Sequence, residues 1–170
     1  MSRIQVLVDN DGERDAVVSL LDDRYDIVTS DEVEQADLYL IGGHSLPSYR
    51  ERLRDRKRED GATFCPVVLL RRQRTRINER ALHDPTTAGS GVIDEVLTAP
   101  LDRKTAVWRL DNLLTRRDTT RNLVGQKEKL EDRERELERY KTFIEQSSDV
   151  ISVLDESGTI QYQSPAVEAV

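Results

Sequence analysis

The chain has 170 residues, of which 36% are apolar and 35% are charged, and its formal net charge is −7. That length allows one domain of ordinary size and a smaller element. No stretch reaches the roughly 18 consecutive apolar residues of a membrane span, and the first residues lack a signal-peptide pattern, so we expect a cytoplasmic protein. The single cysteine, Cys65, argues against disulfides and multi-thiolate metal sites, and its surroundings, FCPVVLL, predict a buried structural thiol.

Acidic residues are in excess, and arginine far outnumbers lysine. The 26 cationic residues include only five lysines, against 33 acidic residues. Binding to a phosphate backbone depends on clustered Lys and Arg, so this balance argues against nucleic acid as the main partner. Two local basic runs, at 50–58 and 71–76, are interpreted as a solvated helix face and a loop.

Apolar runs alternate with helical patterns over the first 115 residues. The expected strands cover 4–8, 25–29, 38–41, 64–70 and 92–97. The expected helices cover 13–24, 47–59 and 77–84, and a long helix begins near residue 102. Residues 31–36 leave room for only a turn or two of helix between the second and third strands.

The order of these elements predicts an α/β fold with a five-stranded parallel, doubly wound sheet of the flavodoxin type. Strands that are apolar on both faces are typical of a sheet covered by helices on both sides. In such sheets ligands bind outside the carboxyl ends of the strands. The residues expected at that edge are Asp9, Asn10, Asp11, Gly42, Gly43, Arg71, Ala99 and Pro100. The segment IGGHSLPSY has neither a GxGxxG nor a P-loop spacing, so its glycines do not predict a phosphate loop.

Four segments, in this order, resemble response-regulator receiver domains: LVDND at 7–11, DLYLIGG at 37–43, PVVLLRR at 66–72 and LTAPLD at 97–102. The resemblance covers about residues 3–117 and implies a CheY-like fold, in which a full helix normally occupies the place of the short segment after the second strand. It also implies four functional parts: an acceptor aspartate ending the third strand, two acids that hold Mg²⁺, a hydroxyl after the fourth strand and a lysine before the fifth-strand proline. Phosphoryl transfer needs a nucleophile, a divalent cation and a compensating charge together.

Three of these parts are replaced in this chain. At the acceptor, hydroxyl and lysine positions stand Gly42, Arg71 and Ala99. Asp9 and Asp11 remain and form at best a weak Mg²⁺ site, while Pro100 keeps the place of the family's proline, whose preceding peptide is typically cis. We therefore interpret residues 1–117 as a receiver-like domain without phosphotransfer. The alternatives are an unrelated flavodoxin-like domain and an active receiver that uses Asp9 or Asp11.

The region after the fifth strand predicts a long helix with two successive patterns. The first is a sheet-packing face formed by Val107, Leu110, Leu113 and Leu114. Trp108 lies off that face and is a candidate dimer contact. The second is a stripe repeating every seven residues, formed by Leu123, Leu130, Leu137 and Ile144. The stripe is compatible with a parallel two-stranded signalling coil or with a solvated single helix.

The last residues resemble the opening of a PAS sensor domain. Residues 149–155 would be its first strand, Ser157-Gly158 the turn, 159–163 the second strand, and SPAVEAV the start of a helix. Two strands alone do not make a stable core, so we expect a piece of a longer protein. The domains expected are thus a receiver-like domain, a helical linker and a truncated PAS start, at 1–117, 118–145 and 146–170.

The sequence therefore predicts a non-phosphorylatable regulatory or dimerisation module, relaying conformational change through a helix to a PAS domain. A histidine kinase is the expected setting, and a PAS-containing helix-turn-helix regulator is the alternative. We expect no catalysis and no cofactor in this segment, a homodimer through the last receiver helix and linker helix, and no nucleic-acid or membrane partner. The acidic, arginine-rich composition resembles that of haloarchaeal proteins. His44 and His83 are expected to be surface residues.

Overall fold

The computed structural model describes residues 1–72, 91–146 and 149–169, which form two compact units, Met1–Val124 and Gly125–Val170. The helix predicted at 77–84, which includes His83, lies outside the described residues, as does most of the second basic run. No helix in the described part of the chain is long and apolar enough to cross a membrane.

The first unit contains five parallel strands in the order β2-β1-β3-β4-β5. The strands are β1 (Arg3–Leu7), β2 (Asp26–Val28), β3 (Leu38–Gly42), β4 (Val67–Arg72) and β5 (Glu95–Ala99). The helices among its described residues are α1 (Asp11–Leu21), α2 (Leu46–Glu59) and α4 (Arg103–Glu145), the last of which continues into the second unit. The predicted parallel, doubly wound sheet is confirmed.

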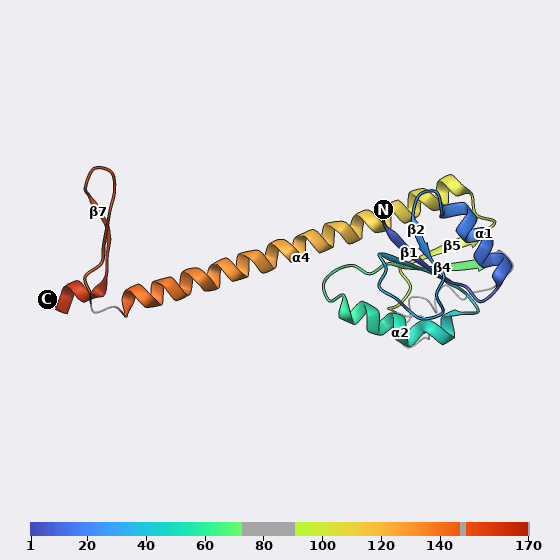
Figure 1. Cartoon of the computed structure of the whole chain (residues 1–170), viewed down its shortest axis with the longest axis horizontal. Helices are drawn as coiled ribbons and strands as arrows, with labels where there is room; N and C mark the ends of the chain where they lie inside the picture. Colours follow the sequence, from blue (N-terminus) through green and yellow to red (C-terminus); the bar gives the residue numbers. More distant parts are fainter. Residues whose placement is uncertain (73–90, 147–148, 170) are drawn as a thin grey trace. The chain divides into compact units, whose positions relative to one another are not determined.

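Two apolar layers hold the sheet, because successive strand side chains point to opposite faces. One layer faces α1 and the start of α4, and the other faces α2 (Figure 1). The strand residues of the first layer are Ile4, Val6, Leu38, Leu40, Val68 and Leu97. Those of the second are Leu7, Tyr39, Ile41, Val67 and Leu69. The predicted packing face of α4 is confirmed, since Leu110 and Leu114 are buried and Val107 and Leu113 are partly buried against the first layer.

The prediction of a short helix at 31–36 is wrong, because residues 29–37 contain no helix. Two buried side chains take the hydrogen bonds that a helix would satisfy. The Gln5 amide donates to the carbonyls of Ser30 and Glu32, and its oxygen accepts from the Glu34 N–H. The Tyr39 hydroxyl donates to the Glu34 carbonyl and accepts from the Ala36 N–H.

Two predicted strands begin later than expected, because side chains take the backbone groups that precede them. The Phe64 N–H donates to Thr120 Oγ1, and the Phe64 carbonyl accepts from Arg117 Nη1. Asp94 Oδ2 accepts from the Val67 N–H at 2.8 Å, so residues 92–94 lie outside the β4–β5 ladder. The basic residues at 71–72 belong to the end of β4 and not to a loop.

The basic run at 50–58 lies in α2, as predicted. Within this helix Glu51 pairs with Arg54 and Asp55 pairs with Arg58, which neutralises much of the basic face. Cys65 is buried, also as predicted, and burial raises the pKa of its thiol to about 11.

The second unit contains the rest of α4 and a two-stranded antiparallel hairpin. Its strands are β6 (Ser152–Leu154) and β7 (Ile160–Gln163), followed by the 3-10 helix η1 (Pro165–Ala169). The hairpin and its turn match the sequence prediction, although β6 is shorter than the strand predicted at 149–155. Gly158 adopts φ 83°, a value that favours glycine. The turn is closed by the Asp155 carboxylate, which accepts from the N–H groups of Ser157 and Thr159 and from the Gln161 amide.

Candidate functional site

The carboxyl edge of the sheet brings most of the predicted site residues together. Register places Gly42 opposite Leu70 and Ala99 opposite Arg72, so the ends of β3, β4 and β5 lie side by side. The Ala99-Pro100 peptide is cis, as the resemblance implies. The ends of three strands and a cis peptide thus meet at this edge.

Two polar side chains that follow β1 form contacts within α1. Asn10 is the N-cap of α1, and its Oδ1 accepts from the Glu13 N–H at 2.9 Å. The Asp11 carboxylate forms an ion pair with Arg14. Among the residues that the structure describes, no group of three His, Cys, Asp or Glu side chains is placed to hold a metal ion.

A buried hydroxyl lies close to Gly42, the position that the resemblance assigns to an acceptor. A Cβ added to Gly42 would lie 3.3 Å from Ser45 Oγ and 3.6 Å from both methyl carbons of Val8. Ser45 is 1% exposed, and its Oγ accepts from the Asp9 N–H at 3.1 Å. A carboxylate side chain at residue 42 would therefore disturb the contact that joins the loops after β1 and β3.

Sequence reasoning missed the role of Ser45. A serine just before Leu46-Pro47 has the pattern of a helix N-cap. It does occupy that position in α2, but its side chain makes no capping hydrogen bond. Its hydroxyl bonds to the loop after β1 instead, and local sequence carries no signal for that long-range contact.

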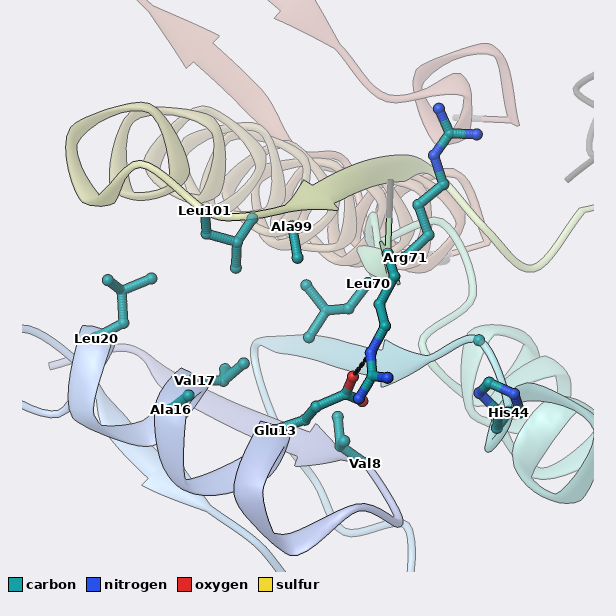
Figure 2. A pocket seen from close by; sticks show the side chains of 12 residues that line it. Val8, Glu13, Ala16, Val17, Leu20, His44, Leu70, Arg71, Ala99 and Leu101 are labelled. Carbon is teal, nitrogen blue, oxygen red and sulfur yellow. Dashed lines mark hydrogen bonds and ion pairs between the residues drawn. The ribbon is translucent and has the colours of Figure 1, made fainter. Parts of the chain in front are cut away.

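Beside this edge lies a cavity of about 380 Å³ between α1 and the end of β5. Val17 and Leu20 of α1 line it, together with Leu70, Ala99 and Leu101 (Figure 2). Arg71, at the hydroxyl position, donates from Nε to Thr98 Oγ1 at 3.1 Å. The residue after it, Arg72, forms an ion pair with Glu13 across the edge. The wall is therefore mostly apolar, and the charges at its rim are engaged with each other or with the sheet.

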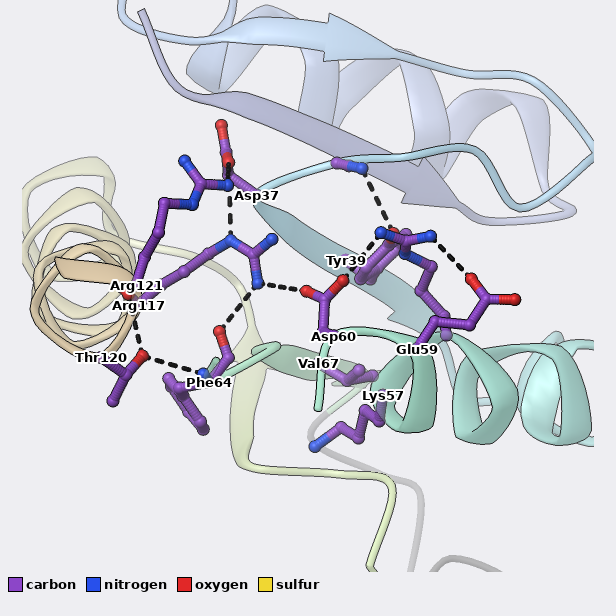
Figure 3. A network of polar contacts seen from close by, with 12 residues as sticks. Asp37, Tyr39, Lys57, Glu59, Asp60, Phe64, Val67, Arg117, Thr120 and Arg121 are labelled. Carbon is purple, nitrogen blue, oxygen red and sulfur yellow. Dashed lines mark hydrogen bonds and ion pairs between the residues drawn. The ribbon is translucent and has the colours of Figure 1, made fainter. Parts of the chain in front are cut away.

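At the amino ends of the strands, a dense polar network attaches α4 to the sheet (Figure 3). Arg117 of α4 pairs with Asp60 at 2.6 Å and lies 3.5 Å from Asp37, which also pairs with Arg121. Asp37 is thus at the far end of β3 from Gly42 and supports α4. A nearby guanidinium, that of Arg116, stacks over the Phe64 ring at 4.3 Å.

The remaining candidate residues of the predicted interface lie on α4. Trp108 is 64% exposed. Leu123, Leu130 and Leu137 are also exposed, and Ile144 is partly buried. His44 is exposed, as predicted.

Several solved structures are similar to this chain, and response regulators are among them. A response regulator receiver modulated diguanylate cyclase from Pelobacter carbinolicus has a TM-score of 0.51 at 19% identity, over 72% of this chain and 99% of that chain. NtrX from Brucella abortus, in complex with ADP, has a TM-score of 0.57 at 16% identity, over 74% of this chain and 29% of that chain. A response regulator from Thermotoga maritima has a TM-score of 0.50 at 13% identity, over 68% of this chain and 98% of that chain.

No protein-family model matches the chain, and no curated protein matches it. At these identities the structural likenesses bear on fold alone. The chain therefore has the α/β fold of CheY-like response-regulator receiver domains, continued by a long C-terminal helix.

Proposed function

We propose that the chain is a non-phosphorylatable, receiver-like regulatory module of a cytoplasmic signal-transduction protein, acting through contacts between proteins. The observation that carries this proposal is the packing at Gly42. The acceptor position has no nucleophile, and a Cβ added there would lie only 3.3 Å from Ser45 Oγ, so a side chain would crowd this hydroxyl. The module has no catalytic activity or cofactor of its own in this proposal.

The surroundings of Gly42 support the loss of phosphotransfer independently. Developing negative charge on a transferred phosphoryl group has to be met by a cation and by donors in the pocket. Here Ala99 stands where the family's lysine would be, and Asp11 is bound to Arg14. Restoring the acceptor alone would leave these deficits in place.

We further propose that the hairpin β6–β7 is the first part of a PAS domain and that α4 passes conformational change to it. All seven residues of the two strands are exposed, including Val153, Leu154, Ile160 and Tyr162. Apolar side chains on both strands of an isolated hairpin need a further layer to cover them. A histidine kinase is the proposed setting, in a haloarchaeal type of cytoplasm that suits the acidic, arginine-rich surface.

Phosphorylation is the direct test. The full chain is incubated with acetyl phosphate and Mg²⁺ beside a receiver that carries an acceptor aspartate, and both are weighed intact. We expect the roughly 80 Da phosphoryl adduct on the control receiver only, because Gly42 offers no nucleophile and Ala99 offers no compensating charge. The variant Gly42→Asp is also expected to remain unmodified. A stable adduct on the wild-type chain that disappears in Asp9→Ala would overturn the proposal.

A further inference from the structure

The second half of α4 carries an apolar stripe with nothing packed on it in the described part of the chain. Leu123, Leu130 and Leu137 are 59%, 58% and 67% exposed. They recur every seven residues, the spacing of one core position of a coiled coil. Exposure of these leucines to water is unfavourable, so we expect another apolar surface to cover them.

Charge decides which heptad position the leucines hold. If they are at position a, the other core position, d, holds Gln126, Arg133 and Tyr140. If they are at position d, the other core position holds Lys127, Glu134 and Lys141. Three full charges in a core are costlier than one arginine beside a tyrosine and a glutamine. The leucines are therefore at position a.

With that assignment the flanking charges complement a second copy of the same helix. In a parallel pair, position g of one chain faces position e of the next heptad on its partner. Lys129 then faces Glu134 of the second copy, and Glu136 faces Lys141 of the second copy. By symmetry each contact occurs twice, so four pairs of opposite charge flank the stripe. None of these four residues forms an ion pair within the described part of the chain, whereas Lys127, Glu131, Asp132 and Arg135 do.

The single stripe also selects the orientation. In a parallel, in-register pair each position a meets the same position of the partner, so leucine packs on leucine. In an antiparallel pair position a meets position d, so every leucine would face Gln126, Arg133 or Tyr140. Only the parallel arrangement removes the leucines from water together.

We propose that residues 123–144 of α4 pair with the same segment of a second copy of this chain, in parallel and in register. The Lys129–Glu134 and Glu136–Lys141 contacts between copies set that register. The inference deepens the proposed function, since it rests on the module acting through contacts between proteins, and it names the partner as a second copy, the surface and the alignment.

Cysteine crosslinking of the full chain tests the alignment. Leu123→Cys and Leu137→Cys are made separately, with Glu128→Cys on the outer face of the helix as the matched control. We expect disulfide-linked dimers at both leucine positions, at least about fivefold above the control, because identical position-a residues lie within disulfide reach only when parallel and in register. An antiparallel pair can bring together at most one of the two positions. Crosslinking at one or neither of them, with a dimer still seen by sedimentation, would overturn the alignment but leave the dimer. A monomer by sedimentation would refute both the dimer and its alignment.

Charge exchange tests the pairs that set the register. Glu134→Lys, Lys129→Glu and the double exchange are compared by sedimentation at low salt, with Glu128→Lys as a control carrying the same change of charge outside the interface. Each single exchange is expected to weaken dimerisation about tenfold, because it turns two attractions into repulsions, and the double exchange should return to within about threefold of wild type. Equal effects of Glu134→Lys and Glu128→Lys, or no rescue by the double exchange, would refute the assigned contacts. Circular dichroism confirms that each variant remains helical.

Discussion

Arg117 and Asp60 form an ion pair that is almost closed to solvent, with side chains 2% and 7% exposed and 2.6 Å between Nη1 and Oδ2. Arg117 belongs to α4, and Asp60 follows the last residue of α2. The same Nη1 donates to the Phe64 carbonyl at 2.8 Å, just before β4. One guanidinium thus connects α4 to the chain segment between α2 and β4.

Removing the Asp60 carboxylate should lower the free energy of unfolding substantially. Asp60→Ala leaves a buried guanidinium without its main counter-charge, and we expect a loss of about 3 kcal/mol in the free energy of unfolding, measured in urea. Asp55→Ala, which breaks the exposed pair with Arg58, should change it by less than about 0.5 kcal/mol. Similar losses in both variants would show that the network is not the main attachment of α4.

A methyl group at residue 42 should destabilise the protein, because it would crowd Ser45. In Gly42→Ala the new Cβ lies 3.3 Å from Ser45 Oγ, whereas in Gly43→Ala the nearest atom is the Leu70 carbonyl oxygen at 3.8 Å. We expect Gly42→Ala to destabilise the protein by about 1 kcal/mol more than Gly43→Ala. In a Ser45→Ala background that difference should shrink, since the crowded oxygen is gone. A double-mutant cycle from urea curves gives the coupling, and a coupling near zero would place the strain elsewhere.

The stability of the β6–β7 turn should fall as the pH is lowered from about 4 to about 2. Hydrogen bonds from Ser157, Thr159 and Gln161 lower the pKa of the Asp155 carboxyl to about 2. Because this folded-state value lies below the ordinary value of about 3.9, the charged carboxylate stabilises the turn above about pH 4. That contribution is lost as the pH falls through about 2. The amide NMR shift of Thr159 should titrate with a midpoint near 2, and Asp155→Asn should abolish the titration. A midpoint near 4 would mean that the turn does not hold the carboxylate.

The native thiol should be nearly inert. Burial, assisted by the charge of Asp60, raises the pKa of Cys65 to about 11. At pH 8 its thiolate fraction is then about a hundredfold or more below that of an ordinary cysteine, and alkylation should slow accordingly. The thiol of Glu128→Cys, which is exposed on the outer face of α4, gives the reference rate in the same chain under reducing conditions. Comparable rates for the two thiols would contradict the buried position.

Much of the fold could be predicted because its apolar pattern is local. Near-continuous apolar runs such as the one at 38–41 mark central strands, and the spacing of Leu110 and Leu114 marks the packing face of α4. The errors occurred where side chains take over backbone hydrogen bonds. Asp94 delays β5, and Gln5 replaces a helix, and neither contact has a signature in a short window of sequence.

The candidate site was predictable as a set of residues at one edge of the sheet but not as a packed structure. The four segments that resemble receivers located Gly42, Arg71 and Ala99 at one edge of the sheet. They could not show that Ser45 fills the space beside Gly42, because the contact joins residues 36 positions apart. Nor could they place Asp37 in the network around Arg117, where it accepts from the Arg3 N–H at 3.0 Å.

Gln5 offers a criterion for recognising related chains. Its amide is fully buried in the middle of β1, and it fixes three backbone groups of the helix-free segment at its side. A chain with an apolar residue at that point would leave those groups without partners, so it would have to build the helix or lose the segment's shape. A polar residue in the first strand and a short link between the second and third strands should therefore occur together when receiver-like sequences are compared.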